Sequence, residues 1–280
     1  EKYLSNPRHI EVQIVADKYG NVIHLAERDC SIQRKHQKVV EIAPSPRLND
    51  SVRKELLRTS KKAMIKLGYE SVGTVEYLVD EDDNFYFIEM NTRVQVEHTI
   101  TEAISGVDII YRMIRIAEGQ KLPFMQEDIK FRGYAIEFRI NAEDPKNGFI
   151  PSSGRISTYL SPGGPGVRMD SIGHKDYIVP TNYDSMIGKL IVTGLDWDGV
   201  VRKSRRALDE FIIAGIPTNI PLHREIVRDD DFKEGVFNTT YLDKKLPTFT
   251  MDVIQHLEED EAKNERIAAI AAVIRMSQQK

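Results

Sequence analysis

A strongly apolar segment runs directly into a row of alternating polar residues in the stretch FYFIEMNTRVQVEH, residues 85–98. Its first four residues are aromatic or β-branched, as is typical of a strand. From there every second residue is polar: Glu89, Asn91, Arg93, Gln95 and Glu97. Because side chains alternate sides along an extended chain, we expect these five to line one face, roughly 6.6 Å from one to the next. The preceding segments GTVEYLV and DEDDN predict a β-hairpin whose first strand carries Glu76.

The residue types in this row suit a metal ion and an anion, followed by proton transfer. Glu76, Glu89 and Asn91 offer hard oxygen ligands of the kind that bind Mg²⁺ or Mn²⁺ together with nucleotide phosphates. Arg93 presents a fork that matches a planar oxyanion, and Glu97 is a carboxylate that can accept a proton. Each residue alone is more often a solvated charge, but five in phase after an apolar strand favour a site.

Two further segments carry candidate binding residues. The basic extended stretch SIQRKHQK contains Gln33, His36 and Lys38. It can contact phosphates or an acidic substrate, but it can equally be an exposed basic edge strand. In EFRINAEDP, Arg139 interrupts an apolar strand, and we expect it to be half exposed or paired with a carboxylate such as Glu137 or Glu143.

Helix and turn signals divide the rest of the chain. We expect a helix over 49–67, with Gly68 as its stop, another over 101–117, with Thr101 as its cap, and a third over 197–214. Further helices are expected in TNIPLHREIVRD and from 250 to 280. Between 131 and 193, short alternating segments broken by NAEDPKNG, SPGGPG and PTNYDS predict antiparallel β structure.

Composition and charge restrict the classes of partner and compartment. The 280 residues carry a formal net charge of -4 with both signs interspersed, which gives no reason to expect a nucleic-acid surface. No apolar run approaches the roughly 18 residues of a membrane span, so no membrane partner is expected. The single cysteine, Cys30, fits a reducing, cytoplasmic compartment and a core position. Because Glu1 already lies within a structured pattern, we expect a fragment of a longer protein.

Four motifs together resemble the biotin carboxylase family, which has the ATP-grasp fold: AERDCSIQRKHQKVVEIAP, EMNTRVQVEH, EFRINAEDP and YDSMIGKL. The similarity runs from Glu1 to about residue 246, and the motifs are long and correctly ordered. It implies an α+β fold: an ATP-grasp carboxy-terminal half over 1–130, a mainly antiparallel β domain with helices over 131–246, and a helical tail over 247–280. In the first part we expect an antiparallel sheet with helices on one side and the nucleotide on the other.

The resemblance implies ATP-dependent carboxylation of biotin by bicarbonate through carboxyphosphate. By position, it places the nucleotide near Glu1, Lys2, Leu4, His9, Gln33 and His36, and a pair of Mg²⁺ or Mn²⁺ ions at Glu76, Glu89 and Asn91. It places bicarbonate at Lys38, Arg93, Gln95 and the backbone of Val96, makes Glu97 the general base, and assigns Arg139 to the biotin enolate. The implied cofactors are ATP, the metal ions and biotin on a carrier protein or domain.

The resemblance also implies partners. These are the biotin carboxyl carrier, a carboxyltransferase, and a second copy of the chain in a homodimer with contacts from 131–246. Pro165 stands where some relatives carry a bulky dimer-contact residue. The tail after residue 246 is more similar to that of free-standing pyruvate carboxylase subunits than to that of the acetyl-CoA carboxylase type, and the final carboxyl acceptor stays open.

Two other functions are open at this point. A carbamoyl-phosphate-synthetase-like ATP-grasp ligase would share the carboxyphosphate chemistry and the acidic metal set, but we do not expect it to carry EFRINAEDP followed by a β-rich region. A noncatalytic module that only assembles a larger complex is disfavoured by the intact row from Glu76 to Glu97. Since the family's amino-terminal domain and glycine-rich lid would precede Glu1, we expect this chain alone to be inactive.

Overall fold

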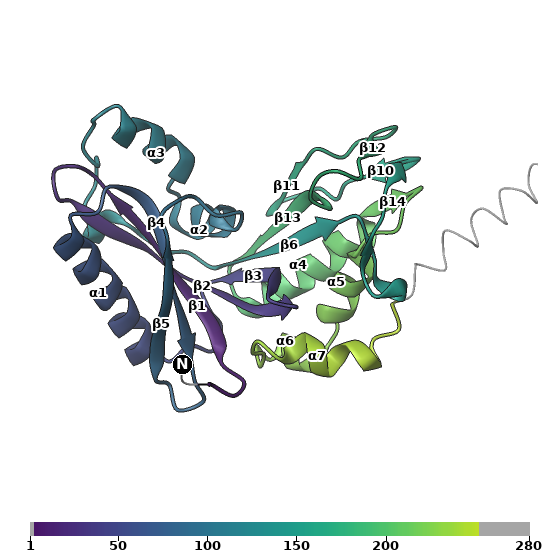
Figure 1. Ribbon diagram of the computed structural model, residues 1–280, viewed down its shortest axis with the longest axis horizontal. Helices are drawn as coiled ribbons and strands as arrows, with labels where there is room; N and C mark the ends of the chain where they lie inside the picture. The colour runs from purple at the N-terminus through teal and green to yellow at the C-terminus, as the bar shows by residue number, and fades with distance from the viewer. Residues whose placement is uncertain (1–2, 252–280) are drawn as a thin grey trace, which may run out of the picture. The chain divides into compact units, whose positions relative to one another are not determined.

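The computed structural model describes residues 3–251, and the chain up to Phe249 forms one compact unit. At its centre lies a sheet of eight strands, in the order β11-β13-β6-β3-β2-β1-β4-β5, in which every neighbouring pair is antiparallel (Figure 1). The strands are β1 (Arg8–Ala16), β2 (Val22–Arg34), β3 (Gln37–Ala43), β4 (Ser71–Val79), β5 (Phe85–Asn91), β6 (Tyr134–Asn141), β11 (Val167–Ser171) and β13 (Met186–Gly194). The expected α+β class with a mainly antiparallel sheet is confirmed.

The large sheet continues across the boundary predicted at residue 130. β3 pairs with β6, with Val40 opposite Phe138 and Ile42 opposite Ile136, so strands from both sides of that boundary share one hydrogen-bonded ladder. The division into 1–130 and 131–246 therefore stays a prediction. The predicted helical tail is described only in its first residues, as the 3₁₀ turn Leu246–Thr248, and beyond residue 251 it lies outside the described residues.

Helix α1 (Asp50–Leu67) covers one face of the large sheet. The side chain of Asn49 accepts a hydrogen bond from the Ser51 N–H at its start, and Gly68 ends it in the left-handed conformation, as the sequence predicts. Its buried positions, Val52, Leu56 and Met64, pack in one cluster with Ile10, Val12 and Ile14 of β1. The even-numbered positions of β1 thus face this helix, which leaves the odd-numbered ones for the other face.

The opposite face of the sheet carries two more helices as well as the polar cleft. α2 (His98–Ser105) packs on β2, β3 and β6, while α3 (Ile109–Ala117) packs on β4. Ile109 and Ile116 of α3 share a core cluster with Val15 of β1. The expectation that the helices lie on one side of the sheet was therefore wrong, because α1 packs on one face and α2 and α3 on the other. Apolar residues near one end of β1, β2 and β4, such as Val15, Ile23 and Val72, let α3 pack beside the polar cleft.

The predicted helix over 101–117 is two helices. α2 already begins at His98, and Gly106 ends it at φ 70°. Asp108 then caps α3, its side chain accepting a hydrogen bond from the Tyr111 N–H. A left-handed glycine followed at once by a capping aspartate is both a stop and a start signal, and the continuous apolar pattern around it obscured this break.

The second part of the chain adds helices and short ladders. Helix α4 (Trp197–Glu210) ends four residues earlier than predicted, because Ile212–Ala214 forms strand β14, which suits its β-branched residues. Among the described residues, the other α-helices are α5 (Ile220–Ile226), α6 (Asp230–Lys233) and α7 (Tyr241–Lys245). The short pairs are β7 (Glu143–Asp144) with β8 (Ile150–Pro151), β9 (Gly154–Arg155) with β12 (Ile178–Val179), and β10 (Thr158–Leu160) with β14. Within residues 3–251, no helix has the length and apolar character needed to cross a membrane.

Candidate active site

A cleft of about 1390 Å³ opens over β1, β2, β4 and β5, and β6 borders it. It brings together every predicted site residue that the structure describes: Leu4, His9, Gln33, His36, Lys38, Glu76, Glu89, Asn91, Arg93, Gln95, Val96, Glu97 and Arg139. The predicted nucleotide residues Glu1 and Lys2 lie outside the described residues. Side chains far apart in sequence thus meet in one polar cavity, as a binding site requires.

Two carboxylates stand opposite each other at one end of the cleft. Glu76 of β4 and Glu89 of β5 are direct partners in the antiparallel ladder. The Asn91 side-chain nitrogen donates to a carboxylate oxygen of each, both at 2.9 Å. Hard oxygen atoms gathered on neighbouring strands fit a divalent cation of the Mg²⁺ type.

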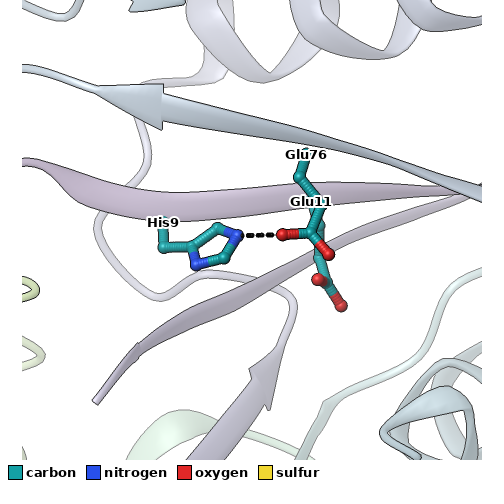
Figure 2. Close-up of side chains that lie close together, drawn as sticks. All are labelled: His9, Glu11 and Glu76. Atoms are coloured by element: carbon teal, nitrogen blue, oxygen red, sulfur yellow. Dashed lines mark hydrogen bonds and ion pairs between the residues drawn. The ribbon is translucent and has the colours of Figure 1, made fainter. Parts of the chain in front are cut away.

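His9 and Gln33 form a chain of hydrogen bonds that ends on Glu76, and Figure 2 shows its last link, from His9 to Glu76. The Gln33 amide nitrogen lies 2.6 Å from His9 Nδ1, and His9 Nε2 lies 2.6 Å from Glu76 Oε2, so the ring links the amide to the carboxylate. Burial alone would raise the pKa of Glu76, but the His9 hydrogen bond and the charge of Lys38 lower it to about 2. Glu76 is therefore an anion at neutral pH, the form that binds a cation.

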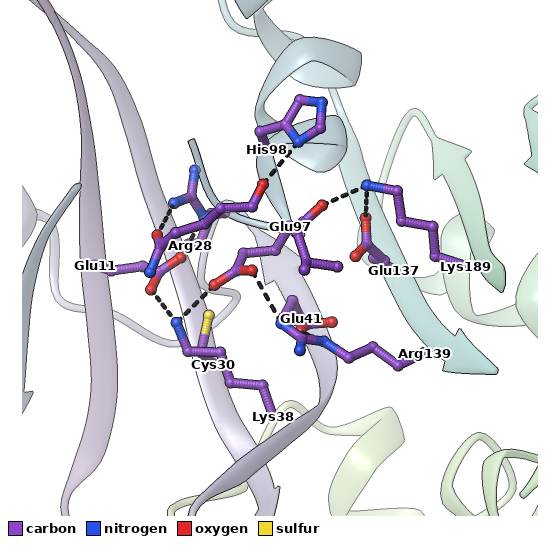
Figure 3. Close-up of polar contacts among 12 residues, drawn as sticks. Glu11, Arg28, Cys30, Lys38, Glu41, Glu97, His98, Glu137, Arg139 and Lys189 are labelled. Atoms are coloured by element: carbon purple, nitrogen blue, oxygen red, sulfur yellow. Dashed lines mark hydrogen bonds and ion pairs between the residues drawn. The ribbon is translucent and has the colours of Figure 1, made fainter. Parts of the chain in front are cut away.

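Glu97 is held between two cations. Lys38 donates its Nζ to Glu97 Oε1 at 2.6 Å, and Arg139 donates to Glu97 Oε2 at 3.0 Å (Figure 3). Lys38 also donates to Glu11 Oε2 at 2.5 Å. Burial alone would raise the pKa of Glu11, but Arg28 and Lys38 lower it to about 2. The arrangement keeps Glu11 charged and places Lys38 and Arg139 beside Glu97 at the cleft.

The extended geometry expected for the whole polar row was wrong beyond Asn91. β5 ends there, the His98 N–H donates to the Gln95 carbonyl at 3.3 Å in a turn, and Glu97 becomes the residue that precedes α2. Val94 turns into the apolar cluster of α3, which bends the chain. The row still lines the cleft, since the Glu97 side chain makes no capping bond and points to Lys38.

Arg139 is paired with carboxylates, as expected, but with Glu41 and Glu97 in place of the two named examples. Its Nε donates to Glu41 Oε1 at 2.5 Å, in addition to the bond with Glu97, whereas Glu137 and Glu143 bind other groups. Glu41 comes from β3, the strand next to β6, so only the strand order reveals the pair. Burial raises the pKa of Glu41 to about 7 and that of Glu137, its partner across the ladder, to about 8.

Arg28 is the main residue that the sequence reasoning missed. It is fully buried, and its guanidinium donates to Glu11, Gln13, Thr74, Gln95 and Thr101. The bond to the Gln95 oxygen fixes that amide, whose nitrogen then donates to Glu76 at 2.7 Å. A signal was present: in RHIEVQIVA the odd positions His9, Glu11 and Gln13 are polar in an otherwise apolar strand, which calls for a buried partner.

Comparison with known proteins places this geometry in a family. Residues 1–125 match the model of the ATP-binding domain of the carbamoyl-phosphate synthase L chain, and residues 137–244 match that of the biotin carboxylase C-terminal domain. The second match separates the chain from a carbamoyl-phosphate synthetase, as expected from EFRINAEDP.

Two curated relatives and one solved structure illustrate the similarity. Biotin carboxylase of Pseudomonas aeruginosa is 53% identical over 246 residues, covering 88% of this chain and 54% of that protein. A pyruvate carboxylase subunit from Methanothermobacter thermautotrophicus is 48% identical over 284 positions, covering 98% and 58%. The biotin carboxylase domain of Hydrogenobacter thermophilus 2-oxoglutarate carboxylase, solved as a dimer with MgADP, ADP and bicarbonate, superimposes with a TM-score of 0.87 at 52% identity, covering 90% and 55%.

The chain spans about half the length of the curated relatives that it matches. Its identity to them, its fold and its matching C-terminal domain agree with the four motifs that the sequence presents. The chain belongs to the biotin carboxylase family.

Proposed function

We propose that the complete protein carrying this sequence catalyses the ATP-dependent carboxylation of biotin by bicarbonate, as the biotin carboxylase component of a biotin-dependent carboxylase. The observation that carries the proposal is the setting of Glu97. A carboxylate lies between Lys38 and Arg139, in the same cleft as the opposed carboxylates of Glu76 and Glu89. Acid–base, anion-binding and metal-binding chemistry thus share one cavity.

In the first step, Glu97 takes the proton of bicarbonate, and the resulting oxyanion attacks the γ-phosphorus of ATP. The P–O bond to ADP breaks, which leaves carboxyphosphate and ADP. Lys38 offers a point charge to the anion, and Arg93, whose side chain is exposed at the cleft, offers a planar fork. Their role is to orient a weak nucleophile for in-line attack.

The metal and nucleotide positions come from the family's pattern and from the donor set. Glu76, Glu89 and Asn91 would hold the cations, and Leu4, His9, Gln33 and His36 line the part of the cleft assigned to the nucleotide. When bound, Mg²⁺ or Mn²⁺ neutralises charge on the phosphate oxygens. His9 contributes by keeping Glu76 ionised and correctly turned.

In the second step, carboxyphosphate yields CO₂ and phosphate, and the phosphate removes the proton of the biotin ureido nitrogen. That nitrogen then forms the new bond to CO₂. Arg139 stabilises the negative ureido oxygen electrostatically. Its guanidinium is already fixed by Glu41 and Glu97, so little reorganisation is needed when the charge develops.

The partners follow from the same proposal. The biotin is carried by a carrier protein or domain, a carboxyltransferase receives the carboxyl group, and residues 131–246 contribute to a homodimer. Relatives are named for pyruvate and for 2-oxoglutarate as well as simply biotin carboxylase, so the acceptor is not assigned. The buried free thiol of Cys30 fits a reducing, cytoplasmic compartment.

The experiment is ADP formation by the complete protein with bicarbonate, biotin and ammonia added or omitted in turn. The proposal expects release of ADP that needs bicarbonate and rises with biotin. Stimulation by ammonia instead would support a carbamoyl-phosphate type of ligase. ATP turnover that ignores bicarbonate and biotin would contradict the proposal.

A further inference from the structure

Two buried contacts tie the segment before and after Glu97 to the β6–β13 strand pair. Lys189 of β13, which Figure 3 shows beside Glu137, donates its Nζ to the backbone oxygen of Val96. Thr99 of α2 donates its hydroxyl to Glu137 of β6. The Lys189 Nζ lies 3.7 Å from Glu137 Oε2, and the two side chains are 12% and 0% exposed. The proposed chemistry assigns no role to Lys189 or to Glu137.

The Lys189 contact fixes the peptide that leads into Glu97. The Val96 carbonyl belongs to the same rigid plane as the Glu97 N–H, so holding this oxygen sets the direction in which the Glu97 Cα leaves the loop. On the other side of Val96, the Gln95 carbonyl accepts from the His98 N–H at 3.3 Å and from His98 Nδ1 at 2.8 Å. Both peptides flanking Val96 are therefore held.

The Glu137 contact fixes the start of α2. Thr99 is fully buried, and its hydroxyl reaches a carboxylate that is also fully buried, so the pair is shielded from water. Lys189 stands opposite Arg139 in the ladder between β13 and β6. The β6–β13 strand pair therefore acts on Glu97 in two ways. Arg139 of β6 donates to a carboxylate oxygen of Glu97, and Lys189 and Glu137 hold the backbone on either side of Glu97.

We propose that Lys189, together with Glu137, is a positioning residue for Glu97: the pair locks the loop between β5 and α2 onto the β6–β13 ladder and so aims the carboxylate between Lys38 and Arg139. The consequence for catalysis rests on the proposed function, whereas the locking itself is a property of the folded chain. A displacement of about 1 Å at a reacting group can cost about a hundredfold in rate, so a lock of this kind affects the rate of this reaction.

The test compares Lys189→Met with Lys203→Met in the complete protein. Lys203 is a matched control, because its Nζ also donates to a backbone carbonyl, that of Thr193 at 3.0 Å, far from Glu97 in the sequence and outside the lining of the cleft. Lys189→Met should lower kcat about tenfold or more and raise the KM for bicarbonate, while the KM for ATP stays within about twofold. Lys189→Arg, which keeps a donor and a charge, should recover most of the loss, and Lys203→Met should match the unchanged protein.

Hydrogen exchange supplies a readout that does not depend on activity. In Lys189→Met, the amides of His98 and Ile100 should exchange about tenfold faster than in Lys203→Met, because the turn that they close is no longer tied down. Equal exchange in the two variants would overturn the proposed lock, as would unchanged bicarbonate kinetics in a folded Lys189→Met protein.

The two proposals fail in different ways. If the unchanged protein shows no bicarbonate-dependent ATP cleavage, the proposed function fails while exchange still decides whether Lys189 locks the loop. If Lys189→Met does not fold, Thr99→Val replaces it in both measurements, since it removes the second tie and keeps the shape of the side chain. The same losses are expected from it, and normal kinetics and exchange would contradict the proposal.

Discussion

The ammonium of Lys38 lies 2.6 Å from a carboxylate oxygen of Glu97 and 2.5 Å from one of Glu11. Burial alone would lower the pKa of Lys38, but the negative groups around it, Glu11 and Glu97 among them, raise it above its ordinary value. Lys38 therefore stays charged at any pH at which the protein works. The proposed base and the proposed anion ligand are already paired, so the bicarbonate of the proposed reaction would enter a site in which these two groups are in place.

Arg93→Lys tests the orientation of the anion. We expect turnover to fall by roughly two orders of magnitude, about 2.7 kcal/mol, because lysine keeps the charge and loses the two parallel donors. The requirement for ATP should hardly change, since Arg93 follows the metal positions along the chain. The matched reverse change, Lys38→Arg, should be milder. The measurement is steady-state kinetics of biotin-dependent ATP cleavage by the complete protein, with bicarbonate and ATP varied separately. A mainly raised KM for ATP in Arg93→Lys would make that residue a nucleotide ligand.

Glu89→Gln tests the metal position. The change keeps the shape of the side chain and removes one charge from the pair formed with Glu76, so the Mg²⁺ concentration needed for half-maximal ATP cleavage should rise about tenfold. Glu55→Gln is the control, because Glu55 is exposed on α1 and paired with Arg58. The same Mg²⁺ dependence in both variants would remove Glu89 from the metal site.

Glu137→Gln tests how buried carboxyls make stability depend on pH. The pKa values of Glu41 and Glu137 are raised in the folded state to about 7 and about 8, so between pH 4.5 and 8 these two carboxyls bind more protons in the folded chain than in the unfolded chain. The contribution of these two carboxyls to the free energy of unfolding should therefore fall as pH rises through this range, by about 1.4 kcal/mol for each whole unit by which a pKa is raised. His24 and His223, whose pKa values burial lowers to about 4, give an opposing rise below about pH 6.5, which the comparison with an unchanged protein cancels.

Removing one of these acids should flatten that fall. The rise of stability from pH 2 to 4.5 should persist, because it comes from Glu11 and Glu76, whose pKa values are lowered to about 2. Denaturant unfolding at a series of pH values measures the free energy of unfolding in both ranges, below and above pH 4.5. An equally steep decline above pH 4.5 in Glu137→Gln would show that the decline does not come from Glu137.

Gly133→Ala tests the close approach that starts β6. Gly133 has φ +63°, and a methyl group there would lie 2.1 Å from the backbone oxygen of Gly194. Since neither backbone can give way cheaply, we expect a loss of about 3 kcal/mol or more in the free energy of unfolding. Gly148→Ala has a similar φ of +67° but open space around it, and should cost only about 1 kcal/mol. Similar midpoints for the two variants in denaturant would exclude the steric account.

Local signals in the sequence predicted local structure well. The hairpin of β4 and β5 and the capped helix α1 follow from alternation, turn residues and capping residues that lie within a few positions of each other. The polar row identified the segment that lines the cleft, because five hydrogen-bonding residues in phase are rare after an apolar strand. Its shape beyond Asn91 depends on where Val94 packs, which no local pattern contains.

What the sequence did not predict depends on strand order. Glu41 meets Arg139 only because β3 lies beside β6, and Arg28 meets Gln95 only because β2 and the loop after β5 face the same cleft. Such pairs join residues 67 or more positions apart, so the partner of each residue cannot be predicted from the segment in which it lies. A charged residue inside an apolar strand predicts a buried partner, because burying a charge without a partner costs too much free energy.

The most direct test follows labelled carbon from bicarbonate into biotin with the complete protein and its Glu97→Gln variant. The account predicts that the unchanged protein forms carboxybiotin only when ATP and Mg²⁺ are present. It also predicts that Glu97→Gln, which keeps the shape of the side chain and cannot take the proton, forms it about a hundredfold more slowly. ATP cleavage without label in biotin, or equal rates of labelling in the two proteins, would contradict it.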